Sequence, residues 1–270
     1  MTTTVFSKVR MFITVFALVT AGMTGMAHAD MLTGNMTNES LRSFFKFRDD
    51  GHWYYAAPIE GENLTTGQVM NLFCTDHYTY TTPDFENPKL GQPYNPVALN
   101  SPTMTLYSNA QIAALNSLFS HVYGTIVDAD DNLLNNASGW AFQLAVWEIV
   151  HETSSKWSLS SGSFGISSAM TYSKPNLTGA QTDNALYWEV ISLTDSWFAA
   201  IANESLWGSK YPKSDIELTV YVAEGGTHVS QTMISTVGPP KNVTPEPASL
   251  LIVASGLALL PFTRRKRNPQ

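Results

Sequence analysis

A short apolar segment near the C-terminus, followed at once by positive charge, most limits how this chain can fold. It spans residues 248–262, after Pro245, Glu246 and Pro247, and precedes four basic side chains: Arg264, Arg265, Lys266 and Arg267. At about 1.5 Å per residue a helix here covers roughly 22 Å, so it could occupy a ~30 Å hydrocarbon core only with membrane thinning and snorkelling. The basic residues would stay cytoplasmic, with the preceding chain outside. We expect a transmembrane segment and basic tail at residues 248–270; an ordinary anchor and a buried core helix are the alternatives.

The N-terminus has the features of an export signal. Lys8 and Arg10 precede an apolar stretch at residues 11–21, and Ala27-His28-Ala29 forms a small-residue cleavage site. We expect a signal peptide at residues 1–29, a folded body at residues 30–237 and a linker containing the Pro-Glu-Pro tripeptide at residues 238–247. Removing both signals leaves about 215 residues, enough for one domain with a substantial core.

The tail resembles a PEP-CTERM sorting signal. The resemblance rests on Pro245-Glu246-Pro247, the short apolar stretch and the terminal basic cluster. It implies that a membrane-bound processing enzyme of the exosortase type recognises the tail. It also implies that the inner membrane of a Gram-negative bacterium holds the precursor, and that the body is then released or re-attached at the cell surface. The tail indicates the destination of the chain, not its activity.

Composition narrows the partners of the body. Charged residues make up 14% of the chain and the net charge is -7, so nucleic acid is not an expected partner. Cys74 is the single cysteine. Because an exported chain meets an oxidising compartment, an unpaired thiol must be buried, used or protected. Burial as a small apolar side chain is the simplest outcome.

Strand patterns occupy both ends of the body. Residues 41–82 are rich in aromatic and β-branched side chains, and the turn sequence Asp49-Asp50-Gly51 interrupts them, which predicts short antiparallel strands with Cys74 at the end of one. Residues 216–223 alternate apolar and polar side chains, and Gly225-Gly226 predicts a hairpin to a strand at 228–237. Residues 81–103 contain several prolines and are expected to be a loop.

Helical periodicity lies between these strands. Ile112, Leu115, Leu118 and Phe119 recur at helical spacing, with Asn109 as the cap and Gly124 as the stop. Further helices are expected at about 138–152 and 182–202, and the Ser- and Gly-rich residues 153–179 are expected to be an exposed loop. The patterns predict an α+β fold, in which an antiparallel β sandwich or barrel-like framework carries a helical subdomain inserted at about 108–202.

Gln143 is the unusual residue of the second predicted helix. Trp140, Gln143, Trp147 and Val150 share one face at helical spacing. An amide on an apolar face costs free energy unless it has hydrogen-bond partners or has been chemically changed. We therefore expect Gln143 to be paired or modified.

The sequences at 73–76 and 143–147 together resemble the thioester domains of bacterial surface adhesins. In that family a strand cysteine and the glutamine of a Thr-Gln-Xaa-Ala-Ile/Val-Trp motif lose ammonia and form an internal thioester. Matching positions would make Cys74 the source of the sulfur and Gln143 the source of the acyl carbon. Ala145 and Trp147 match the rest of the motif, whereas Phe142 stands where the family often has threonine.

The resemblance implies a defined chemistry. A thioester is an activated acyl group, and an amine on a surface protein or polysaccharide could displace it and leave a covalent amide. The chain would react once, as a reagent and not as an enzyme. Four aromatic side chains would keep water from the bond: Phe73, Trp140, Phe142 and Trp147. His77 and His151 could act as a base or orient an amine, and Asp76 and Glu148 are secondary candidates.

Two other functions fit the same sequence. Cys74 and Gln143 could be ordinary packed residues of a structural exopolysaccharide or biofilm protein with the same tail. A cysteine hydrolase using Cys74 with His77 or His151 is the third interpretation, although no catalytic signature surrounds the cysteine. We expect no cofactor and no metal ion, because Leu133 and Gly139 occupy the glycine and glutamate positions of a segment that otherwise starts like a calcium loop.

Overall fold

The described part of the chain is a body of antiparallel strands and helices. The computed structural model describes residues 29–35, 41–56, 58–76, 90–128, 132–134, 136–153, 156–173, 181–224 and 230–236. Contacts divide the chain into Met1–Thr236 and Val237–Gln270, and all described residues belong to the first unit. Residues 1–28 of the expected signal peptide, the linker, the sorting tail and His77 lie outside the described residues. Within these ranges, no helix combines the length and apolar character needed to cross a membrane.

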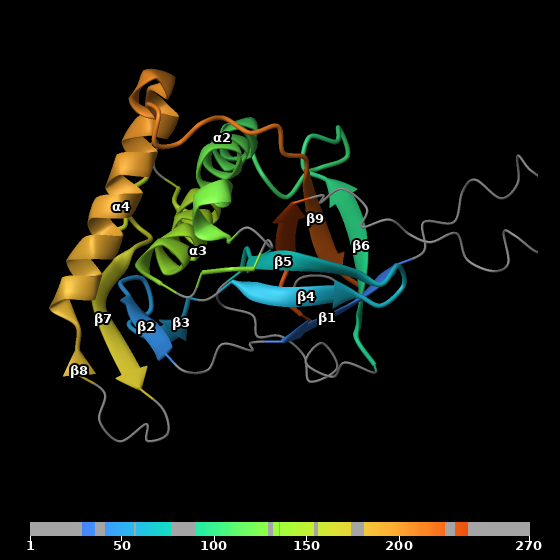
Figure 1. Ribbon diagram of the computed structural model, residues 1–270, viewed down its shortest axis with the longest axis horizontal. Coiled ribbons are helices and arrows are strands. Elements are labelled where there is room, and N and C mark those ends of the chain that lie inside the picture. Colours follow the sequence, from blue (N-terminus) through green and yellow to red (C-terminus); the bar gives the residue numbers. More distant parts are fainter. Residues whose placement is uncertain are drawn as a thin grey trace, which may run out of the picture. The chain divides into compact units, whose positions relative to one another are not determined.

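Six strands close into an antiparallel barrel (Figure 1). In barrel order they are β1 (Asp30–Asn35), β4 (Ile59–Asn63), β5 (Gln68–Cys74), β10 (Met233–Thr236), β9 (Leu218–Ala223) and β6 (Gln92–Ala98). Pairs far apart in the sequence set the register, such as Asp30 with Tyr94 and Met233 with Cys74. Closure gives each strand a partner on both sides, which removes the exposed edges of an open sheet.

A second antiparallel sheet lies beside the helices (Figure 1). Its strand order is β3 (Trp53–Tyr55), β2 (Leu41–Phe47), β7 (Ile166–Ser173) and β8 (Gln181–Thr182). The long central pair runs from Leu41 opposite Ser173 to Phe47 opposite Ile166. Phe45 and Phe47 are fully buried, so this sheet contributes directly to the core.

Each of the three described α-helices begins at a side-chain cap. α2 (Asn109–Ile126) starts with a capping box in which the Ser108 hydroxyl accepts from the Gln111 N–H at 3.3 Å and the Gln111 side chain accepts from the Ser108 N–H at 2.8 Å. α3 (Ala137–His151) is capped by Asn136, and α4 (Asn184–Ala202) by Asp183. A short 3₁₀ turn, η1 (Glu204–Leu206), follows α4.

α3 is the central helix of the body. It contacts α2, α4 and barrel strand β5, and in Figure 1 it lies between the barrel and α4. Every residue from Gly139 to Ile149 is buried. The expectation of one apolar face through Trp140, Gln143 and Trp147 is therefore too narrow, because this stretch of the helix is enclosed all round.

The structure confirms the α+β class, the antiparallel barrel-like framework and the helices. Two predicted loops are wrong, because residues 81–103 contain β6 and residues 153–179 contain β7. The pairing of β6 with β1 stops at Tyr94, so Pro96 pairs only with β9. A proline, which has no N–H to donate, is tolerated at such a position because one edge of the strand is unpaired there. Since β7 and β8 form a sheet with β2, the helical region 108–202 is not a continuous insertion.

The ends of α2 also differ from the prediction. Ser108, not Asn109, is the cap, because only its hydroxyl forms the capping box. Gly124 does not stop the helix, which continues to Ile126. A glycine ends a helix when it adopts a positive φ at the C-terminus, and Gly124 is not among the glycines with positive φ in the described residues.

Arg48 ties the loop between α3 and β7 to the second sheet. Its guanidinium donates to the carbonyls of Ser160 at 2.7 Å, Phe164 at 2.9 Å and Leu159 at 3.2 Å. Because Arg48 is exposed on its outer side, we expect Arg48→Met to lower the free energy of unfolding by only about 1–2 kcal/mol. Urea unfolding would measure this, with Lys46→Met as a control that removes a charge from β2. Equal stability of the two variants would contradict the prediction.

Candidate functional site

Cys74 lies where the barrel loses one strand partner. β5 pairs with β10 along one edge as far as Cys74, but on the other edge its pairing with β4 stops at Leu72, opposite Ile59, the first residue of β4. The Thr75 N–H donates to the Thr232 carbonyl at 2.9 Å, on the β10 side. The backbone groups of successive strand residues face opposite edges of the strand. Because Thr75 faces β10, the N–H and C=O of Cys74 face the other edge, where β5 has no pairing with β4 at this position.

Gln143 fills this gap in the strand ladder. The Cys74 N–H donates to Oε1 of Gln143 at 3.1 Å, and Nε2 of Gln143 donates to the Cys74 carbonyl at 2.7 Å. Gln143 has no exposed surface, and Cys74 is 5% exposed. The structure thus brings the two predicted residues together, with the side-chain amide taking the place of a strand backbone.

This arrangement makes the Gln143 carbonyl more electrophilic and keeps the Cys74 thiol protonated. An N–H held at Oε1 polarises the Gln143 carbonyl and would stabilise negative charge that develops on the oxygen. Burial, reinforced by the charge of Asp76, raises the pKa of the Cys74 thiol to about 12. The thiol is therefore protonated at neutral pH, and nucleophilic attack requires its proton to leave as the new bond forms.

Phe73 and Phe142, the aromatic neighbours of Cys74 and Gln143 in the sequence, are both buried. The ring of Phe73 packs against Phe142 with centroids 4.9 Å apart and against Phe119 at 5.3 Å. Phe142 also contacts Phe119, at 4.8 Å, so it serves as a core side chain where a threonine would offer a hydroxyl. The remaining predicted residues, Trp140, Ala145 and Trp147, are buried too.

Tyr107 and Thr232 hold Thr75, the residue just after Cys74, in place. The Tyr107 hydroxyl donates to Oγ1 of Thr75 at 2.9 Å, and Oγ1 in turn donates to the Thr232 carbonyl at 3.1 Å. Burial raises the pKa of Tyr107 to about 12, so the phenol stays neutral and keeps its proton to donate. No sequence pattern marks Tyr107, which lies in the loop before α2.

His151 and Asp76 both lie at this site. Burial lowers the pKa of His151, while Asp76, a hydrogen bond to the Thr75 backbone and Asp49 act in the opposite direction. The His151 ring stacks on Phe164 with centroids 5.5 Å apart. His77, the other predicted histidine, lies outside the described residues.

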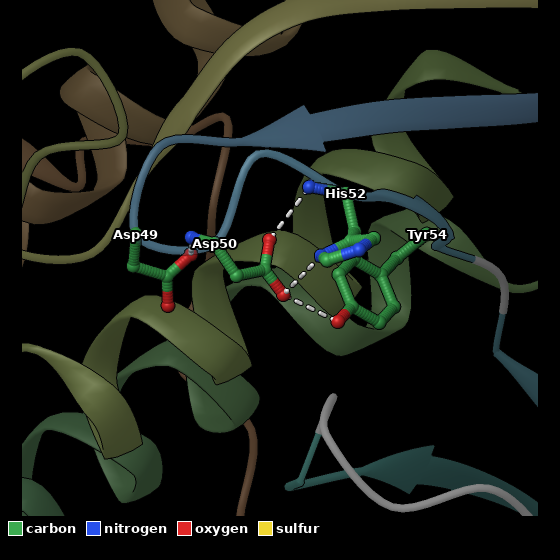
Figure 2. A network of polar contacts seen from close by, with 4 residues as sticks. All are labelled: Asp49, Asp50, His52 and Tyr54. Atoms are coloured by element: carbon green, nitrogen blue, oxygen red, sulfur yellow. Dashed lines mark hydrogen bonds and ion pairs between the residues drawn. The ribbon is translucent and has the colours of Figure 1, made fainter.

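Asp49 belongs to the turn between β2 and β3, which a polar network holds in shape (Figure 2). The carboxylate of Asp50 accepts from the His52 N–H at 2.7 Å and from the Tyr54 hydroxyl at 2.5 Å. The carboxylate of Asp49 accepts from the Asp50 N–H at 2.9 Å. Gly51 has a φ of 73°, a backbone conformation that glycine adopts easily, which explains why a glycine stands in this predicted turn.

Glu148 belongs to a different environment from Cys74. One oxygen of its buried carboxylate accepts from the Ser158 N–H at 2.6 Å, in the loop between α3 and β7. Burial raises the pKa of Glu148 to about 8. This hydrogen bond gives Glu148 a role in holding the loop. Within the described residues, no three His, Cys, Asp or Glu side chains are grouped to hold a metal ion.

Comparison with known proteins returns two solved structures of interest. No protein-family model matches the chain, and no curated protein matches it. The chain is similar to the N-terminal domain of the Streptococcus pyogenes pilus tip adhesin Cpa, with 11% identity, a TM-score of 0.44, and coverage of 79% of this chain and 95% of that one. It is also similar to the N-terminal thioester domain of fibronectin-binding protein SfbI from Streptococcus pyogenes, with 12% identity, a TM-score of 0.37, and coverage of 77% and 98%.

Proposed function

We propose that the body is an exported surface domain in which Cys74 and Gln143 form an internal thioester that captures amine-bearing targets. The observation that carries the proposal is the pair of hydrogen bonds, at 3.1 and 2.7 Å, between the Gln143 amide and the Cys74 backbone. They hold the acyl carbon of Gln143 in the core, beside the residue that bears the single thiol of the chain.

The bond would form by exchange of ammonia for sulfur. Sγ of Cys74 attacks Cδ of Gln143, the thiol proton passes to Nε2, and the Cδ–Nε2 bond breaks to release ammonia. The Cys74 N–H supports the negative charge on Oε1 during attack. Losing Nε2 removes the donor to the Cys74 carbonyl, at a cost of about 1–3 kcal/mol. Closing a loop across a separation of 69 residues would offset this cost by about 4 kcal/mol on the chain-entropy account of cross-links.

Capture would use the stored acyl group once. An amine on a surface protein or polysaccharide attacks Cδ, an amide forms, and the Cys74 thiol is restored. Since nothing regenerates the thioester, the domain acts as a covalent adhesive and not as an enzyme. The PEP-CTERM-like tail would deliver it, through an exosortase-type enzyme in the inner membrane, to the surface of a Gram-negative cell.

Intact-mass measurement of the purified mature body tests the bond. We expect a mass lower than the sequence mass by one ammonia, and we expect Cys74→Ala and Gln143→Ala each to abolish this loss. Incubation with methylamine should then add one molecule of amine to the native chain and none to either variant. A wild-type chain of unmodified mass would sink the proposal.

A structural surface protein without covalent chemistry is the second candidate, and one observation favours it. The Gln143 amide completes the free edge of β5 through ordinary hydrogen bonds, so the fold has a use for this residue even without a thioester. Quantitative labelling of Cys74 by a thiol reagent in the denatured chain would support this scaffold role.

A further inference from the structure

The peptide group between Cys74 and Thr75 is hydrogen-bonded on both of its sides. Its carbonyl accepts from Nε2 of Gln143 at 2.7 Å, and its N–H donates to the Thr232 carbonyl at 2.9 Å. The first bond holds the nitrogen that thioester formation expels, and the second ties the same peptide to the residue before β10. The orientation of this one peptide therefore decides where the nitrogen of Gln143 lies.

Two hydroxyl groups strengthen the attachment of this peptide to Thr232. Oγ1 of Thr75 donates to the Thr232 carbonyl at 3.1 Å, so this carbonyl accepts from both the backbone and the side chain of Thr75. The Tyr107 hydroxyl donates to Oγ1 at 2.9 Å. Because Oγ1 accepts from Tyr107, its own proton is directed to Thr232. Thr75 and Thr232 are buried, so little water can compete for these bonds.

The bond between Nε2 and the Cys74 carbonyl should strengthen as ammonia leaves. In the amide, Nε2 is a neutral donor. Once sulfur has added to Cδ and the thiol proton has passed to the nitrogen, Nε2 carries a positive charge. A hydrogen bond from a charged donor is roughly twice as strong as one from a neutral donor. A contact that is stronger in the transition state than in the ground state accelerates the step.

We propose that the Cys74 carbonyl receives both the nitrogen that leaves Gln143 and the nitrogen that later enters, and that Thr75 and Tyr107 are positioning residues for this carbonyl. The inference rests on the proposed function and deepens it by naming the groups that place the nitrogen. Loss of ammonia leaves this buried carbonyl without its donor. An entering amine restores the missing hydrogen bond with one of its N–H groups.

Capture is the reverse of bond formation with a different nitrogen. The amine adds to Cδ of Gln143 and becomes positively charged, while one of its N–H groups donates to the Cys74 carbonyl. Its other proton passes to the sulfur, and the C–S bond breaks with its electron pair on the sulfur. An amide and the Cys74 thiol remain, so the reaction balances without any further reagent.

A thiolate nucleophile separates this role from a general effect on the site. It attacks the same Cδ but has no hydrogen to donate to the Cys74 carbonyl. Both nucleophiles need the Cys74 N–H, which lies 3.1 Å from Oε1 and belongs to the preceding peptide. Damage to the whole site would therefore slow both reactions, whereas misplacement of the Cys74–Thr75 peptide would slow only the reaction with an amine.

The test measures capture of methylamine and of 2-mercaptoethanol by the full mature chain, each followed by intact mass. Thr75→Val removes Oγ1 and keeps the shape of the side chain, and we expect it to slow methylamine capture by about 10-fold or more. Tyr107→Phe leaves Oγ1 bonded to the Thr232 carbonyl, so we expect a smaller, several-fold slowing. Capture of 2-mercaptoethanol should keep the wild-type rate in both variants.

Tyr123→Phe is the matched control. It also removes a buried tyrosine hydroxyl beside β5, one that accepts from Nδ2 of Asn71 at 2.7 Å, but it leaves the bonds of Thr75 in place. It should capture both nucleophiles at the wild-type rate.

The outcomes separate this inference from the proposed function. Wild-type methylamine capture in both Thr75→Val and Tyr107→Phe, or equal slowing with the two nucleophiles, would overturn this inference and leave the proposed function standing. If Thr75→Val does not fold or does not lose ammonia, the same comparison on Tyr107→Phe decides alone. A wild-type chain that lacks the ammonia loss overturns both.

Discussion

Replacing Gln143 by leucine should lower the free energy of unfolding by about 2–6 kcal/mol relative to the Cys74→Ala chain, in which the Gln143 amide is intact. The variant keeps the apolar bulk but leaves the N–H and C=O of Cys74 buried without their partners at 3.1 and 2.7 Å. Each buried backbone group without a partner costs about 1–3 kcal/mol. Urea unfolding followed by tryptophan fluorescence would measure the loss.

Cys74→Ala is the matched control for this variant. It also prevents a thioester, but it leaves both hydrogen bonds to the backbone of residue 74 intact. The difference between the two variants therefore measures the strand-completing role of Gln143 separately from any covalent bond. If Gln143→Leu is no less stable than Cys74→Ala, the amide does not hold β5 in the way described.

Replacing Glu148 by glutamine should remove a large pH dependence of stability. Burial raises the pKa of Glu148 from 4.5 to about 8 in the folded chain, so folding takes up a proton between these values. Its contribution to stability is complete below pH 4.5 and is lost progressively as pH rises towards 8, because the unfolded carboxylate releases its proton first. At pH 8 the loss amounts to several kcal/mol.

Glu148→Gln keeps an acceptor for the Ser158 N–H and carries no charge. We expect it to match the wild type near pH 4.5 and to be clearly more stable at pH 8, by urea unfolding at both values. Glu189→Gln on the exposed face of α4 is the control and should follow the wild type throughout. Parallel pH curves for wild type and Glu148→Gln would contradict the prediction.

The parts of the fold that follow from local periodicity were predictable. The alternation over residues 216–223 predicts β9, which spans Leu218–Ala223, and the helical spacing from Ile112 predicts α2. β7 was missed because Ser167, Ser168 and Thr171 make it resemble a polar loop, and only its pairing with β2 identifies it as a strand. The closed barrel was beyond prediction for the same reason, since β1 with β6 and β5 with β10 are long-range pairs.

At the site, the sequence predicted the residue types but not the way they pair. A buried glutamine in α3 indicated an amide with a partner or a modification. That its partner is the backbone of Cys74 depends on where β4 begins relative to the end of β5, which no local pattern encodes. The burial of Phe73 and Phe142 could be predicted because large aromatic side chains near a strand end and in a helix are usually buried.

The position of β10 has a mechanical consequence. The chain leaves the described body at Thr236, and β10 pairs directly with β5 through Met233 and Cys74. Tension applied beyond Thr236 would load the hydrogen bonds of this short strand first, then pass through β5 to Gln143 in α3. A target attached at Gln143 would thus be joined to the pulled end through α3, β5 and β10, and because capture breaks the bond to Cys74, the junction between α3 and β5 would then be noncovalent.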